Sequence, residues 1–150
     1  MARWSILLLA GWSLGCGGQH DELTPYVHKL HGLSHYNQTL VAYGQYLGAE
    51  ATAAQAQDIA QVLARYRGEL VALGQPSDKH LRALHNEMLR ILDEASRKLV
   101  EPTFPTFVPN AQKAIRYVEA EMTTVINNLA RLWQSSGHPD PCPLVWPAAA

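Results

Sequence analysis

Histidine is the residue type in this chain best suited to bind a ligand or move a proton. The 150 residues include seven histidines, and His28, His31 and His35 are spaced three and four residues apart. On a helix this spacing places the three imidazoles on one side, where two of them can share a divalent ion such as zinc or copper. A helix drawn at about 100° per residue puts them about 100° to 160° from Leu30, on the polar face. The pattern predicts either a metal site or a solvated helix surface, and it favours the surface.

Two further polar residues occupy different positions on their predicted helices. His85 lies about 40° from Leu81, beside the apolar stripe of its helix, and Asn37 lies on the stripe of the first helix. We expect both to be partly buried, where polar groups need hydrogen-bond partners. Such residues usually fix how helices align with one another. The alternative is a role in ligand binding or proton transfer.

Motifs of known enzyme and cofactor sites do not occur in the sequence. Cys-x-x-Cys-His, which attaches c-type haem, is missing, and so is the Glu-x-x-His pattern of di-iron bundles. The His-Glu-x-x-His motif, glycine-rich phosphate loops and the nucleophile elbow are also missing. We therefore expect no enzyme activity and no cofactor, with a divalent metal such as zinc or copper as the alternative.

Four segments repeat apolar residues at the pitch of an α-helix, which predicts four amphipathic helices. Residues of N-cap type precede them, and glycine or proline follows each one. Thr52 and Gln55 form a capping-box pattern before the second segment. The predicted limits are Thr24 and Gly48, Thr52 and Gly74, Ser77 or Asp78 and Pro102, and Asn110 and Gly137.

The short connections between these segments determine the expected architecture. Neighbouring helices joined by short loops run antiparallel, so we predict an all-α chain with an up-down-up-down four-helix bundle at 25–136. The first and third helices should be diagonal neighbours. The proline-containing segment 101–109 reads as a stiff loop. The tail 137–150 holds four prolines and cannot form a helix.

The first fifteen residues differ from the rest of the chain. A basic residue, Arg3, precedes an apolar run of about ten residues, and small residues follow, as in a secretory signal peptide. That run is too short to span a bilayer, which takes about 20 residues. We therefore expect residues 1–15 to be removed as a signal peptide and residues 16–24 to form a tether.

The end of this leader suggests how the chain is held. The stretch Ser13-Leu14-Gly15-Cys16 resembles the lipobox of bacterial lipoproteins. The resemblance covers residues 1–16 and implies that Cys16 is lipidated and becomes the first residue. Gly17, in place of aspartate, resembles the pattern of outer-membrane sorting. Ser13 and Gly15 also suit an ordinary signal peptidase, which would leave Cys16 free to pair with Cys142, the one other cysteine.

These observations predict a location and a class of function. Twelve basic residues nearly balance thirteen acidic ones, so no strong field attracts nucleic acid. We expect an exported lipoprotein at the outer membrane, facing the periplasm, which acts as a non-enzymatic binding or spacer module of the cell envelope. Its partners would be the membrane, through the lipid, and an envelope protein. In the predicted bundle the first and third helices start, and the fourth ends, at the same end, so all seven histidines gather there. The alternative is a periplasmic metal- or haem-handling bundle that uses this histidine-rich end.

Overall fold

The structure, a computed structural model, describes residues 21–47, 52–100 and 107–146. Those residues form helices and loops and contain no strand, which confirms the all-α class. The helices are α1 (Leu23–Gly32), α2 (Ser34–Tyr46), α3 (Ala53–Ala72), α4 (Lys79–Val100) and α5 (Phe107–Ser135). Cys16, the predicted signal peptide and the tether up to residue 20 lie outside the described residues.

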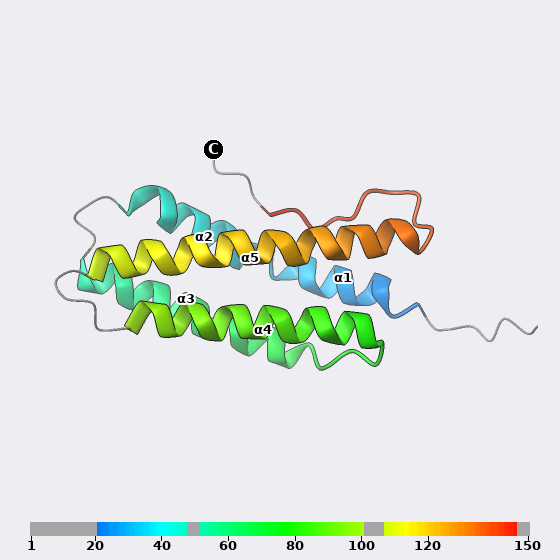
Figure 1. The fold of residues 1–150 in the computed structure, drawn as a ribbon, viewed down its shortest axis with the longest axis horizontal. Coiled ribbons are helices and arrows are strands. Elements are labelled where there is room, and N and C mark those ends of the chain that lie inside the picture. The colour runs from blue at the N-terminus through cyan, green and yellow to red at the C-terminus, as the bar shows by residue number, and fades with distance from the viewer. Residues whose placement is uncertain (1–20, 48–51, 101–106, 147–150) are drawn as a thin grey trace, which may run out of the picture.

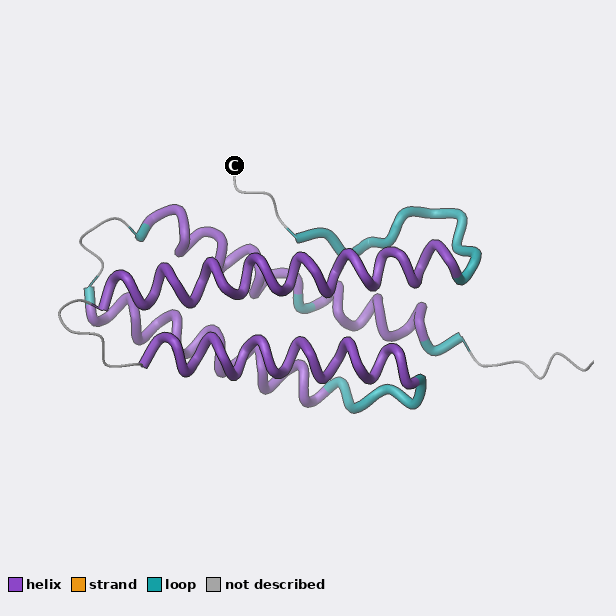
Figure 2. Tube along the Cα trace, viewed as in Figure 1, coloured by secondary structure: helices purple, strands orange, loops and turns teal. Residues whose placement is uncertain are grey.

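The helices lie lengthwise beside one another (Figure 1). Helix α4 packs against α3 and α5, and α2 packs against the same two helices. Helix α1 continues the direction of α2 toward the end of the molecule where α4 begins and α5 ends. The tube in Figure 2 shows the described loops at that same end, between α3 and α4 and after α5.

The apolar stripes of all five helices meet in one hydrophobic core. Each stripe alone would expose too much apolar surface in water, and packing them together removes that surface from solvent. Every helix contributes fully buried side chains, which include Val27 of α1, Leu40 of α2, Ile59 and Leu70 of α3, Leu92 of α4 and Leu129 of α5. No helix in the described part of the chain is long and apolar enough to cross a membrane.

The segment predicted as one helix from Thr24 to Gly48 is divided into α1 and α2 at Leu33. The carbonyl of Gly32 is engaged by the His35 imidazole at 3.0 Å, and the Tyr36 amide bonds to the Leu33 carbonyl at 3.0 Å. The His35 side chain thus occupies the Gly32 carbonyl, which would otherwise accept a backbone amide of the next helical turn. Glycine also has a low helix propensity. The prediction of one continuous helix was wrong for this local reason.

The start of α1 also differs from the prediction. Helix α1 begins at Leu23, so residues 23 and 24 belong to the helix and not to the tether, and Thr24 is not the cap. The carboxylate of Asp21 accepts hydrogen bonds from the backbone N–H and the hydroxyl of Thr24. A carboxylate at this place satisfies an amide that has no acceptor inside the helix.

Other helix limits follow the sequence. Thr52 and Gln55 form the predicted capping box of α3, and the Asp78 carboxylate accepts the His80 and Leu81 amides at the start of α4. Gly74 and Gly137, which follow α3 and α5, have φ of 78° and 82°. That left-handed conformation is common after helices and favours glycine.

Helix α5 starts earlier than predicted. It begins at Phe107, so Asn110 lies inside the helix and is not its cap, and the loop does not extend to residue 109. Pro109 stands in the first turn, where an amide has no helical acceptor and its loss costs little. The segment 101–106 and residues 48–51 lie outside the described residues, so the predicted ends at Gly48 and Pro102 do as well.

The segment after α5 contains no helix from residue 138 to 146. It folds back along the bundle, as Figure 1 shows. The Leu144 side chain is buried in the core, and Cys142 and Trp146 pack partly against it. The indole N–H of Trp133 donates to the carbonyl of Asp140 at 2.7 Å, which ties the segment to α5.

Candidate functional site

A buried hydrogen bond joins α1 to α4 through the interior. The hydroxyl of Tyr26 lies 2.9 Å from Nδ1 of His85. The Tyr26 side chain is 5 % exposed and the His85 side chain is 2 % exposed. The backbones of these helices were predicted to be diagonal neighbours, and the two long side chains span the distance between them. Among the described residues, this pair is the one polar contact that crosses the core from α1 to α4.

Burial governs the protonation of both partners. It raises the pKa of Tyr26 well above its ordinary value, so the phenol keeps its proton. It lowers the pKa of His85, so the imidazole stays neutral. We therefore assign the Tyr26 hydroxyl as the donor and the neutral Nδ1 of His85 as the acceptor. The pair can share a proton between two helices, although neither residue lines the large cleft described below.

Asn37 is buried on α2 beside a pair of stacked tyrosines. Its side chain is 5 % exposed, and its Oδ1 atom has no hydrogen-bond partner within the described part of the chain. The rings of Tyr36 and Tyr66 stack with centroids 5.1 Å apart. Burial raises the pKa of Tyr66 to about 12, and a hydrogen bond with Asn37 acts in the opposite direction. Asn37 thus helps to hold α2 on α3, and it does not meet His85 in any described contact.

The histidine triplet is on the surface. His28, His31 and His35 are all exposed. His28 points its ring edge toward Trp133, with centroids 6.5 Å apart, while His35 bonds to Gly32 and lies against Tyr36. Across residues 21–47, 52–100 and 107–146, no three His, Cys, Asp or Glu side chains are grouped to hold a metal ion.

An open cleft of about 770 Å³ lies at the end of the bundle where α1 and α4 begin and α5 ends. Polar side chains from those segments line most of it. Glu22 lines this cleft, and its carboxylate accepts hydrogen bonds from the backbone amides of Ser77 and Asp78, both at 2.8 Å. Glu22 thereby ties the start of α1 to the turn before α4.

His138 also lines this cleft. Its ring stacks on Trp133 with centroids 3.8 Å apart. Its Nε2 atom lies 3.4 Å from the Thr24 hydroxyl and 3.8 Å from the Asp21 carboxylate. The hydrogen bond from Thr24, and secondarily the positive charge that His138 can carry, lower the pKa of Asp21. The predicted bundle places His138 at the end where the first helix starts, but no sequence pattern pairs it with Thr24 or Asp21, because it follows a glycine and precedes a proline-rich tail.

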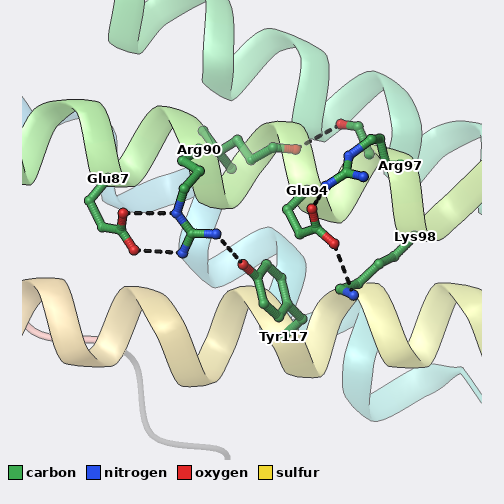
Figure 3. Close-up of polar contacts among 8 residues, drawn as sticks. Glu87, Arg90, Glu94, Arg97, Lys98 and Tyr117 are labelled. Atoms are coloured by element: carbon green, nitrogen blue, oxygen red, sulfur yellow. Dashed lines mark hydrogen bonds and ion pairs between the residues drawn. The ribbon is translucent and has the colours of Figure 1, made fainter.

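A separate set of charged side chains joins α4 to α5 on the outer surface (Figure 3). Arg90 makes two bonds to Glu87, at 2.6 and 2.8 Å, and a third to the Tyr117 hydroxyl of α5 at 3.1 Å. The bond from Arg90 lowers the pKa of Glu87. One turn further along, Glu94 pairs with Arg97 and with Lys98, whose Nζ atom lies 5.0 Å from the Tyr117 ring centroid.

Cys142 is partly buried in the segment after α5 and has no disulfide partner among the described residues. Its predicted alternative partner, Cys16, lies outside the described residues. The pairing of these two cysteines therefore stays a prediction.

Comparisons with known proteins found no similarity to report. No protein-family model matches the chain, and neither the curated proteins nor the solved structures that were searched include a match.

Proposed function

We propose that this protein is an exported lipoprotein of the outer membrane, a helical bundle tethered through Cys16 that acts as a non-enzymatic binding or spacer module of the cell envelope. In this proposal α1 and α2 together serve as the first helix of an up-down-up-down four-helix bundle. The sequence of residues 1–16 supports the export and the anchor. The short distance along the chain from Cys16 to the start of α1 supports the orientation of the bundle.

Four residues separate Cys16 from Asp21, the first described residue. At about 3.6 Å per residue, five peptide units span at most about 18 Å. A lipid on Cys16 would hold the start of α1 within that distance of the membrane surface. Because the cleft is lined by Asp21 and Glu22, it would open toward the membrane, and the far end of the bundle would point into the periplasm.

The intact mass of the membrane-extracted protein tests the anchor. We expect a chain that starts at Cys16 and carries a diacylglycerol and an acyl group. The substitution Cys16→Ser should remove both adducts and release the protein in soluble form. Cys142→Ser is the matched control and should leave the adducts in place. A chain that still begins at Met1, or a Cys16 chain with a free thiol, would contradict the proposal.

Thermal melting with and without zinc or copper separates this role from metal handling. A metal that binds only the folded state stabilises it by RT ln(1 + L/Kd), where L is the free metal concentration, so the melting temperature rises with the logarithm of that concentration once it exceeds Kd. We expect no rise at millimolar metal, because His28, His31 and His35 are spread over the exposed surface of α1 and α2. A rise that disappears when His31→Ala and His35→Ala are combined would favour the metal-handling alternative.

A further inference from the structure

Three contacts between α1 and the rest of the bundle involve histidine. Tyr26 bonds to His85 of α4, and Thr24 meets His138 after α5. His28, on α1 itself, contacts Trp133 of α5 edge-on. Histidine is the side chain whose ordinary pKa lies closest to physiological pH, so these contacts can respond to mild acid.

We propose that α1 is an acid-released element: protonation of His85 breaks its contact with Tyr26 and lets α1 turn away from α4 about the break at Leu33. The inference rests on the buried position of His85, on the groups that face it, and on the separation of α1 from α2. It does not depend on the lipid anchor.

Among the described residues, no negatively charged group shifts the pKa of His85. Tyr26 of α1 bonds to it, and Tyr66 of α3 is the titratable group that acts on Tyr26 in turn. Burial lowers the pKa of His85, and no charged group of α3, α4 or α5 in the described residues shifts it. An imidazolium at this place would lie in the core without a carboxylate, which is costly unless the contact opens.

The direction of the pH effect follows from these facts. His85 is neutral in both the docked and the released states above the ordinary histidine pKa of about 6.5. As the pH falls below that value, a solvated His85 in the released state takes up a proton before the buried one does. The docked state therefore loses stability from about pH 6.5 downward, until the pH reaches the lowered pKa of buried His85.

The chain is built so that α1 can move without α2. The helical hydrogen bonds are interrupted at Leu33, and Gly32 beside it is exposed with open space around its Cα atom. The closest backbone neighbour of α1 is α2, whereas α4 and α5 pack together along their length. Release would uncover the apolar side chains of Val27 and Leu30, which lie in the core when α1 is docked.

His138 acts in the opposite direction. Its Nε2 atom is 3.8 Å from the Asp21 carboxylate, so a protonated His138 forms an ion pair that holds the start of α1. Glu22 also holds the start of α1, through its two bonds to the backbone amides of Ser77 and Asp78. These contacts at the start of α1 therefore oppose the release that protonation of His85 favours.

Hydrogen exchange of the purified protein, with its N-terminus as the cell leaves it, tests the proposal. We compare residues of α1 and α4 at about pH 7.5 and about pH 5, correcting for the intrinsic pH dependence of exchange. Protection of α1 should fall at the lower pH, by up to tenfold for each unit by which burial lowers the pKa of His85. Protection of α4 in its second half should not change.

Three variants assign the effect to its residue. His85→Gln cannot titrate and should make the protection of α1 nearly independent of pH. His80→Gln, an exposed histidine on the same helix, is the matched control and should behave like the unmodified protein. His138→Gln should make the loss of protection larger, because the ion pair with Asp21 can no longer form.

Two outcomes would overturn the proposal. One is equal protection of α1 at the two pH values in the unmodified protein, and the other is an undiminished pH response in His85→Gln. If His85→Gln does not fold, nuclear magnetic resonance of the unmodified protein decides. The amide shifts of α1 must then follow the titration of the His85 ring, and a different midpoint rejects the mechanism.

Discussion

The contact between helices α4 and α5 differs in length and in composition from the contacts that hold α1 in place. The α4–α5 pair consists of 22 and 29 residues with a continuous apolar seam and charged side chains along its outer edge. Helix α1 has 10 residues and ends at a break, so it buries a shorter apolar stripe and adds to it a few specific polar contacts at its ends and middle. Long apolar seams give stability that varies little with pH, while a few polar contacts can be switched.

A cavity in the α4–α5 seam should have the largest effect. Leu92 is completely buried on α4. Leu92→Ala should lower the free energy of unfolding by about 3 kcal/mol, because the packed helices cannot close around the lost volume. Urea denaturation followed by circular dichroism measures it.

The matched substitution on α1 sharpens the difference between the regions. Leu30→Ala should cost less than about 2 kcal/mol, because a short helix next to a break can shift to fill the space. Val100→Ala, at an exposed site, should change stability by less than about 0.5 kcal/mol. Equal losses for Leu30→Ala and Leu92→Ala would show that α1 is as firmly built in as α4.

Removing the Tyr26 hydroxyl should have the next largest effect. Tyr26→Phe leaves Nδ1 of His85 buried without a partner and should lower the unfolding free energy at neutral pH by about 1 to 2 kcal/mol. Tyr36→Phe, which keeps the ring stacked on Tyr66, is the control. Thermal melting of both variants measures the difference, and equal melting temperatures would mean that the buried bond contributes nothing.

Loss of the cap of α4 should be smaller. Asp78→Ala removes two bonds to the amides of His80 and Leu81 and should cost about 1 kcal/mol. Those bonds lower the pKa of Asp78, so its contribution is present above the ordinary value of 3.8 and disappears as the pH falls through the lowered pKa. Melting temperatures of Asp78→Ala and the unmodified protein should differ at neutral pH, and the difference should shrink as the pH falls below 3.8 through the lowered pKa.

The outer charged pairs should matter least. Arg67 bonds to Asp93 at 2.5 Å, but the two side chains are 45 % and 53 % exposed, so water screens their attraction. Arg67→Ala should leave the melting temperature unchanged within about 1 °C. A clear decrease that high salt abolishes would assign the surface pairs a real share in holding α3 on α4.

The sequence predicted features that depend on neighbouring residues better than features that depend on distant ones. The capping box of Thr52 and Gln55 and the glycine end at Gly137 are local patterns, and both are confirmed. The position of His85 beside its apolar stripe predicted burial, and the residue is buried. The predicted start of the last helix was wrong because of Pro109: proline disrupts a helix at most positions but fits its first turn.

The contacts around α1 were beyond the sequence pattern. Nothing in the spacing of His35 shows that its ring takes the Gly32 carbonyl and interrupts a helix whose apolar stripe continues. The bond between Tyr26 and His85 joins residues 59 positions apart on helices expected to be diagonal. Such contacts depend on side-chain length and the packed geometry of several helices, which a helical wheel does not contain.

The ring stack of His138 on Trp133 gives the protein its own optical signal. A protonated imidazole in contact with an indole quenches its fluorescence, and the His28 ring edge lies on the same indole. Outside the predicted signal peptide, the chain has two tryptophans, Trp133 and Trp146. Emission from Trp133 should therefore report, without any added label, how closely the start of α1 is held against the end of α5.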